Sequence, residues 1–174
     1  MDIIAHGLWS YIIFHAKRYW KWALFWGVFP DLLGWGPYFV YRLIKGIPLG
    51  PPVPALIPHW SWTLYGISHS LIVFVFLFGI AYYFLKAGTW PLLAWGIEIL
   101  MDIPFHRPDY LPTPYLWPLS SVESYAFPSL FGWHSPWFMV VNYFIIILSL
   151  LFIAIRKYRK GRQHTTDRTA GQLD

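Results

Sequence analysis

Long apolar runs, separated by short clusters of basic residues or of proline and glycine, make up most of the chain. A helix needs roughly 20 apolar residues to cross a hydrocarbon core about 30 Å thick, and fewer where neighbouring helices shelter it. The second run contains FPDLLGWGP, which is expected to break its helix. The pattern therefore predicts five hydrophobic helices, at 3–16, 20–44, 66–85, 90–104 and 137–155.

Two long connections join these predicted helices. The stretch KGIPLGPPVPALIPHW, at 45–60, is too rich in proline and glycine for a regular helix and is expected to lie at a membrane interface. The second connection covers 107–136, and the polar residues at 161–174 are expected to form a disordered tail. Residues 1–160 are thus predicted to form one integral membrane helical domain.

The composition agrees with a membrane location. The 174 residues are 57% hydrophobic and 22% aromatic but only 12% charged, whereas soluble domains carry about 25% charged residues. The chain has no cysteine, which excludes disulfides and thiolate metal ligands. The predicted fold class is an all-α, polytopic membrane helix bundle.

The formal charge of +5 comes largely from two clusters, KRYWK at 17–21 and RKYRKGR at 156–162, which abut apolar runs. This placement favours anchors beside anionic membrane lipids over a nucleic-acid surface. Loops rich in lysine and arginine remain cytoplasmic, so the C-terminus is predicted to be cytoplasmic and the N-terminus to start outside. Membrane lipids are therefore the expected partners, and no nucleic acid is expected.

Five ionisable residues fall at the same outer level of the predicted topology: His6, Asp31, His69, Glu98 and Asp102. Glu98 and Asp102 are four residues apart in EILMD, so a helix places both on one face. An ionised acid at mid-membrane costs roughly 2.5 to 3.5 kcal/mol, which protonation, basic partners, water or metal ions must offset. Imidazole and carboxylate together suit zinc, manganese or iron. The set predicts a site between helices for two adjacent divalent ions, with Asp102 as the bridge.

Several of these residues also have a purely structural interpretation. His6 suits a membrane interface, and Asp31 suits a helix cap. Ser68 and Ser70 either only hydrogen-bond to His69 or orient it as a metal ligand. Three other histidines are expected at membrane interfaces: His15, His59 and His134. His106 is expected either in a loop or as a metal ligand.

Five motifs occur in the order AHGLWS, FPDLLGW, ISHSL, EILMD and LPTPYLWPLS. Over residues 1–120 they resemble the family of small inner-membrane metal-dependent hydrolases, which is distantly similar to zinc-dependent phospholipase C and to zinc single-strand nucleases. The resemblance implies an all-helical protein of a prokaryotic inner membrane, with metals among its helices and ligands at His6, Asp31, His69 and Asp102. Glu98 stands where the family has a histidine, which either shifts the preferred metal from zinc toward manganese or iron or marks a lost activity.

Together these features predict a membrane-embedded, metal-dependent hydrolase of a phosphoester, with a phospholipid as the expected substrate. Two ions would lower the pKa of a bound water toward neutrality and polarise the phosphoryl oxygens. Glu98 and Asp102 are the expected catalytic carboxylates, and Arg107 either neutralises the substrate phosphate or anchors a lipid headgroup. The alternatives are a proton- or ion-coupled transport component, with Glu98 and Asp102 as carriers, and a noncatalytic membrane scaffold.

Overall fold

Helices are the regular secondary structure of this protein. The structure is a computed structural model, and it describes residues 1–106, 110–120, 132 and 135–170. Within these ranges there is no β-strand, so the predicted all-α class is confirmed. The helices are α1 (Ile3–Phe14), α2 (Trp20–Trp26), α3 (Phe29–Ile44), α4 (His59–Ser68), α5 (Leu71–Leu85), α6 (Leu93–Phe105) and α7 (Pro136–Ala170), with 3₁₀ segments η1 (Pro54–Leu56) and η2 (Lys86–Leu92).

The helices follow the predicted apolar runs, with two differences. The expected break in the second run is present, because α2 ends at Trp26 and α3 begins at Phe29. Helix α4 was not predicted: it begins at His59, inside the connection that was expected to be irregular, and ends at Ser68. The single helix predicted at 66–85 is therefore wrong, because it is divided at His69 and Ser70. Helix α7 continues to Ala170, so the boundary predicted at residue 160 falls inside a helix. The last part of the predicted tail, residues 171–174, lies outside the described residues.

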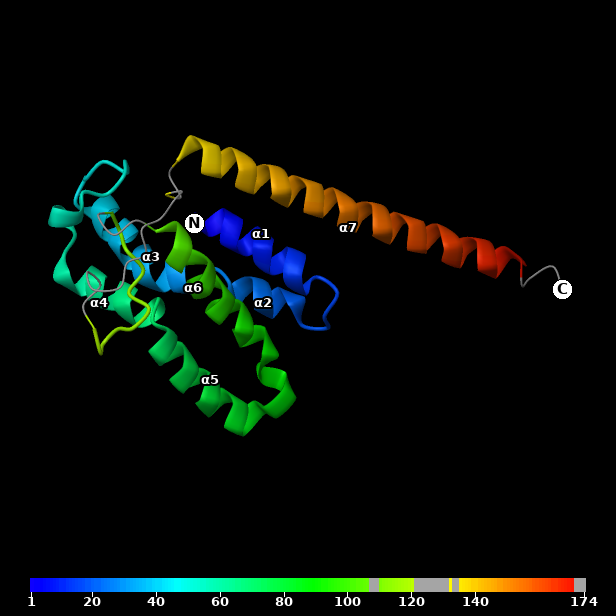
Figure 1. Ribbon diagram of the computed structural model, residues 1–174, viewed down its shortest axis with the longest axis horizontal. Coiled ribbons are helices and arrows are strands. Elements are labelled where there is room, and N and C mark those ends of the chain that lie inside the picture. Colours follow the sequence, from blue (N-terminus) through cyan, green and yellow to red (C-terminus); the bar gives the residue numbers. More distant parts are fainter. Residues whose placement is uncertain (107–109, 121–131, 133–134, 171–174) are drawn as a thin grey trace.

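Figure 1 shows two helical hairpins, α1–α2 and α5–α6, with α7 lying along α1 and projecting beyond it. Ile146 of α7 packs with Ala5, and Trp9 Nε1 donates a hydrogen bond of 2.9 Å to Asn142 Oδ1. Helices α3 and α4 pack against each other at the end of the bundle where α1 begins. The α1–α2 turn and η2, which carry exposed lysines and an arginine, lie at the opposite end.

Two side-chain caps set where the helices near this end begin. The Asp2 carboxylate accepts hydrogen bonds from the backbone N–H groups of Ile4 and Ala5, at 3.1 and 3.0 Å, and so starts α1. Ser70 Oγ accepts from the N–H groups of the second and third residues of α5. Because α5 starts after Ser70 and α4 ends at Ser68, His69 lies at the junction between two helices.

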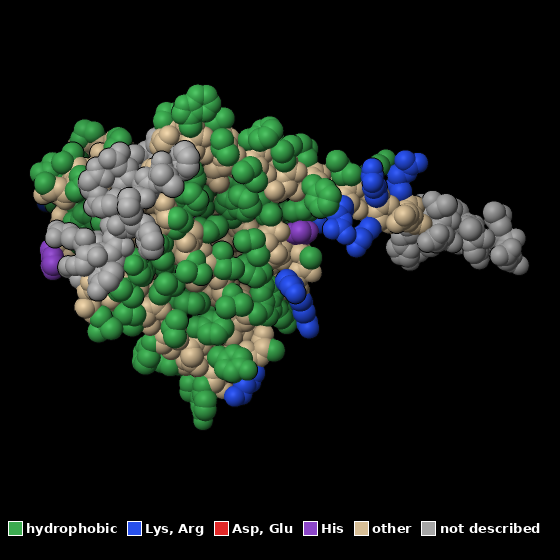
Figure 2. Space-filling view, in the orientation of Figure 1, with side chains coloured by type: hydrophobic (Ala, Val, Ile, Leu, Met, Phe, Trp, Pro, Cys, Tyr) green, Lys and Arg blue, Asp and Glu red, His purple; other side chains and the backbone are tan. Residues whose placement is uncertain are grey.

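Two helical segments are long and apolar enough to cross a membrane: Leu71–Asp102, which turns back at η2, and Pro136–Gln163. This property rests on length and composition, and a core helix of a soluble protein has it too. The five-helix membrane bundle therefore remains a prediction. Figure 2 shows hydrophobic side chains over most of the visible face, with Lys and Arg at its margins and on the projecting part of α7. So extensive an apolar surface is typical of contact with a protein partner or a membrane.

We expect Gly27→Ala to lower the free energy of unfolding by about 1 to 3 kcal/mol, the usual cost of overpacking. A Cβ at Gly27 would lie 1.8 Å from Ser10 Oγ and 2.8 Å from Ser10 Cβ, and Ser10 is itself buried in the α1–α2 hairpin. Gly79→Ala in α5 is the matched control, because a Cβ there meets nothing within 4 Å. Denaturation of both variants, followed by tryptophan fluorescence, checks this; equal stabilities would contradict the close α1–α2 contact.

Candidate metal centre

The predicted site residues come together at the end of the bundle that α3 and α4 cover. They come from α1, from the first turn of α3, from the α4–α5 junction and from α6. Four of the five side chains are fully buried, and the Asp31 side chain is 13% exposed. A sixth group, the imidazole of His106, which is the C-cap residue of α6, joins them. The assembled set is His6, Asp31, His69, Glu98, Asp102 and His106.

Glu98 lies at the centre of this set. Its Oε1 atom is 3.3 Å from His69 Nε2 and 3.9 Å from His6 Nε2. His69 Nε2 is also 3.5 Å from Asp31 Oδ1. Two groups of three residues have ligand atoms within 4.8 Å of one another, and Glu98 belongs to both of them. The geometry therefore makes Glu98 the carboxylate that two metal ions could share.

Asp102 lies one helical turn beyond Glu98 and faces two histidines and an amine. Its Oδ1 atom is 3.0 Å from His6 Nε2, and its Oδ2 atom is 3.3 Å from His106 Nε2. The backbone amine of Met1 forms an ion pair with the same carboxylate and lies 3.1 Å from His106 Nε2. Because Glu98 and Asp102 are four residues apart in α6, both carboxylates lie on one face of the helix and in one buried site.

Ser68 fixes the orientation of His69. Ser68 Oγ donates to the Tyr65 carbonyl at 3.2 Å and lies 2.8 Å from His69 Nδ1, so it accepts from a protonated Nδ1. Nε2 is then directed at Glu98 and Asp31. Ser70 has a role that the sequence analysis did not consider, since its hydroxyl caps α5 and donates to the Trp117 carbonyl.

His106 is the ligand candidate that the sequence left open, because Pro104 made its direction uncertain. The helix continues through Pro104 to Phe105, and the His106 N–H bonds to the Asp102 carbonyl at 3.0 Å. His106 Nδ1 lies 2.9 Å from the Leu111 carbonyl, which leaves Nε2 facing Asp102. Burial lowers the pKa of His106 to about 4, so the imidazole is neutral at pH 7, as a metal ligand must be.

An aromatic residue holds α6 against the α4–α5 junction. Trp95, one turn before Glu98, donates its indole N–H to the Ser68 carbonyl at 2.7 Å. Its ring stacks on Trp26 of α2, with centroids 6.0 Å apart, and meets Phe29 of α3 edge-on. Trp95 therefore holds α2, α3 and α6 against the junction that carries His69. This packing fixes the distance between Glu98 and His69.

Several polar atoms of the site lie within ion-pair distance of one another but make no hydrogen bond of good geometry. Both carboxylate oxygens of Glu98, both ring nitrogens of His6 and Nε2 of His69 make no hydrogen bond to any described residue. Orphaned buried polar atoms are rare in proteins, and each costs about 1 to 3 kcal/mol. Ligand atoms on a tetrahedral ion with bonds of about 2.0 to 2.1 Å lie about 3.3 Å apart, close to the nitrogen–oxygen separations above. The residues present therefore fit a metal ion.

The other interpretations weighed from the sequence have different outcomes. Asp31 does not cap α3, because Val28 is the N-cap residue and makes no side-chain cap. His15 bonds to its own helix, through the Ile12 carbonyl, and His59 begins α4 away from the acids. Arg107 and His134 lie outside the described residues, so the predicted role of Arg107 in binding phosphate has no structural account.

We expect Ser68→Ala to weaken metal binding about 10- to 100-fold while the protein remains folded. The substitution removes the group that orients His69, and loss of such a hydrogen bond to a ligating histidine typically has this effect. Ser149→Ala is the control, because Ser149 Oγ bonds only within α7, to the Ile145 carbonyl. Metal titration by isothermal calorimetry is the measurement. An affinity equal to that of the wild type would exclude His69 as a ligand oriented by Ser68.

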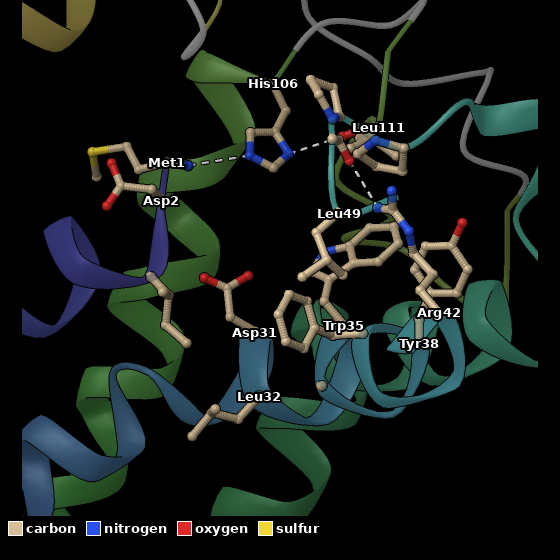
Figure 3. Close-up of a pocket in the computed structure, with 16 residues that line it drawn as sticks. Met1, Asp2, Asp31, Leu32, Trp35, Tyr38, Arg42, Leu49, His106 and Leu111 are labelled. Carbon is tan, nitrogen blue, oxygen red and sulfur yellow. Dashed lines mark hydrogen bonds between the residues drawn. The ribbon is translucent and has the colours of Figure 1, made fainter. Parts of the chain in front are cut away.

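A cavity of about 590 Å³ opens beside the candidate metal centre. Asp31 and His106 line one part of it, together with the first residues of the chain. Figure 3 shows Trp35, Tyr38 and Arg42 of α3 farther along the same cavity. A small molecule could thus reach the Asp31 side of the site.

Comparison with known proteins adds no family. No protein-family model, curated protein or solved structure matches this chain. The resemblance to inner-membrane metal-dependent hydrolases therefore remains an expectation from the five sequence motifs. What defines the class of the protein is its geometry: an all-helical chain with buried histidines and carboxylates that could hold metal ions.

Proposed function

We propose that this protein is a membrane-embedded hydrolase of phosphoesters that depends on two divalent metal ions. The observation that carries the proposal is the Glu98 carboxylate, which is fully buried between His6 and His69 without a hydrogen-bond partner within the described residues. A buried charge of this kind is found in proteins when it is paired or coordinates a metal. Ions on both sides of Glu98 would satisfy its two oxygens.

Six side chains would hold the ions: His6, Asp31, His69, Glu98, Asp102 and His106. Glu98 belongs to both groups of close ligand atoms, so it replaces Asp102 as the proposed shared ligand. When bound, the ions would supply Lewis acidity and an activated water for attack on phosphorus. Mixed nitrogen and oxygen ligands suit manganese, iron or zinc.

The inner membrane is the proposed location, with the site at the outer face and the C-terminus in the cytoplasm. Two features support this. The surface is largely apolar, and the basic turns lie at the end of the hairpins opposite the site. A phospholipid is the proposed substrate, because a site at the level of the headgroups meets the phosphoester of a lipid and an apolar cavity opens beside it.

The test is metal analysis combined with hydrolysis. The protein is purified without chelator, its metals are measured by mass spectrometry, and hydrolysis of bis(p-nitrophenyl) phosphate and release of phospholipid headgroups are assayed. We expect about two transition-metal ions per chain and hydrolysis that chelation abolishes and added metal restores. Absence of bound metal, even after incubation with zinc, manganese and iron, would overturn the proposal. Proton or ion flux in proteoliposomes would then favour the transport alternative.

A further inference from the structure

One face of α3 forms a continuous wall from the candidate metal centre to a buried arginine. Asp31, Trp35, Tyr38 and Arg42 are spaced by four, three and four residues, which aligns them on one side of the helix. All four line the cavity, and Figure 3 shows them in this order along it. Its volume of about 590 Å³ is within the usual range for small-molecule sites.

Arg42 is a buried cation with no counter-ion among the residues that the structure describes. It is only 8% exposed, although it lies in the last turn of α3. Its Nη1 atom donates to the Gly50 carbonyl at 2.8 Å, and its guanidinium lies 5.7 Å from the Tyr38 ring centroid. The Nε atom has no hydrogen bond, and no carboxylate among residues 1–106 and 110–120 is within ion-pair distance. Buried charges are normally paired, and the described part of the chain supplies no anion for this guanidinium.

The cavity between Arg42 and the acids is apolar. Trp35 lies between Asp31 and Arg42 in Figure 3, and Leu49 faces it. Leu32, Phe39 and Leu49, which also line the cavity, are 47%, 50% and 51% exposed and so form a hydrophobic rim. A ligand in this cavity therefore meets an apolar middle, a cation at one end and the candidate metal centre at the other.

We infer that the cavity binds a membrane amphiphile with an anionic group remote from its scissile phosphate, and that Arg42 binds this second group. The reacting phosphate would lie at the Asp31 end, the apolar segment against Trp35, and a carboxylate or second phosphate at Arg42. Arg42 is eleven positions after Asp31 in α3, a rise of about 16 Å along the helix, and side chains on a helix lean toward its N-terminus. The assignment of a substrate rests on the proposed function, whereas anion binding at Arg42 does not.

Binding of two matched probes tests the inference without any hydrolysis. The full chain in phosphatidylcholine nanodiscs is dialysed against 4-phenylbutyrate, or against its uncharged amide, before and after chelation. We expect the wild type to bind the anion about 10- to 100-fold more tightly than the amide in both states, the range for a charge-assisted hydrogen bond. Arg42→Met should remove this preference. Lys45→Met, at the exposed C-cap position just after α3 and outside the cavity, should keep it.

Equal binding of the two probes by the wild type would overturn the inference, even if Arg42→Met did not fold. A preference that survives in folded Arg42→Met, or that disappears on chelation, would also overturn it, because the anion would then bind elsewhere or to metal. Neither probe is a phosphoester, so these results do not depend on turnover. A protein without metal would contradict the proposed function and leave a positive result at Arg42 intact.

Discussion

Replacing Glu98 by glutamine is expected to remove both metal ions and to lower kcat/KM for phosphoester hydrolysis by about a thousandfold or more. Glutamine has nearly the same size but lacks the negative charge that two ions would share, and a metal ion contributes several kcal/mol to such reactions. The carboxylate oxygens have no hydrogen bonds to the described residues, so the substitution breaks none of them. Metal content and hydrolysis of the same preparations are the measurements.

Glu98→His is the informative companion to Glu98→Gln. The family that the sequence resembles has a histidine at this position, and imidazole is a good ligand for zinc. We therefore expect Glu98→His to retain metal and to bind zinc in preference to manganese, compared with the wild type. If Glu98→Gln kept about two ions per chain, Glu98 could not be the shared ligand, and the two-ion site would need a different bridge.

Removal of the metal ions is expected to lower the free energy of unfolding by about 4 kcal/mol, the value for a ligand present at a thousand times its Kd. The physical reason is the burial of three carboxylates in one site, which the ions neutralise in the folded state only. Unfolding in detergent, followed by tryptophan fluorescence with metal and with chelator, checks this expectation.

Glu98→Gln provides the control for this stability difference. If the ions stabilise the protein through the buried site, metal should not change the unfolding midpoint of this variant. An equal change in both proteins would mean that metal acts at the surface or on the detergent. If metal did not change the unfolding midpoint of the wild type, this result would contradict the proposed site, whatever the metal content of the protein after purification.

The existence of the helices could be predicted because local physics decides it. Apolar runs of helical length indicate the helices, and the prolines and glycines that interrupt them indicate where the helices end. The break between α2 and α3 and the turn at η2 followed from the same pattern. Helix α4 was missed because His59 directly follows a stretch with many prolines, and packing against α3 stabilises a helix that composition alone does not favour.

The candidate site was foreseen as a set of residues but not as an arrangement. The spacing of Glu98 and Asp102 follows from helix geometry, and the serines beside His69 suggested that it is oriented. The inward direction of the His106 side chain could not be predicted from the neighbouring sequence, because Pro104 at the end of a helix permits several directions. The position of its ring depends on the Leu111 carbonyl and on Asp102.

The sequence by itself determined that the chain is all-helical and highly apolar. It also showed a few acids and histidines, whose charges are costly to bury among apolar helices. Only the tertiary structure decided that Glu98 lies between two histidines and that Arg42 is buried in a cavity, because residues far apart in the chain meet only when helices pack. A local pattern specifies the face on which a side chain lies. The side chain that it meets depends on the helix packed against that face.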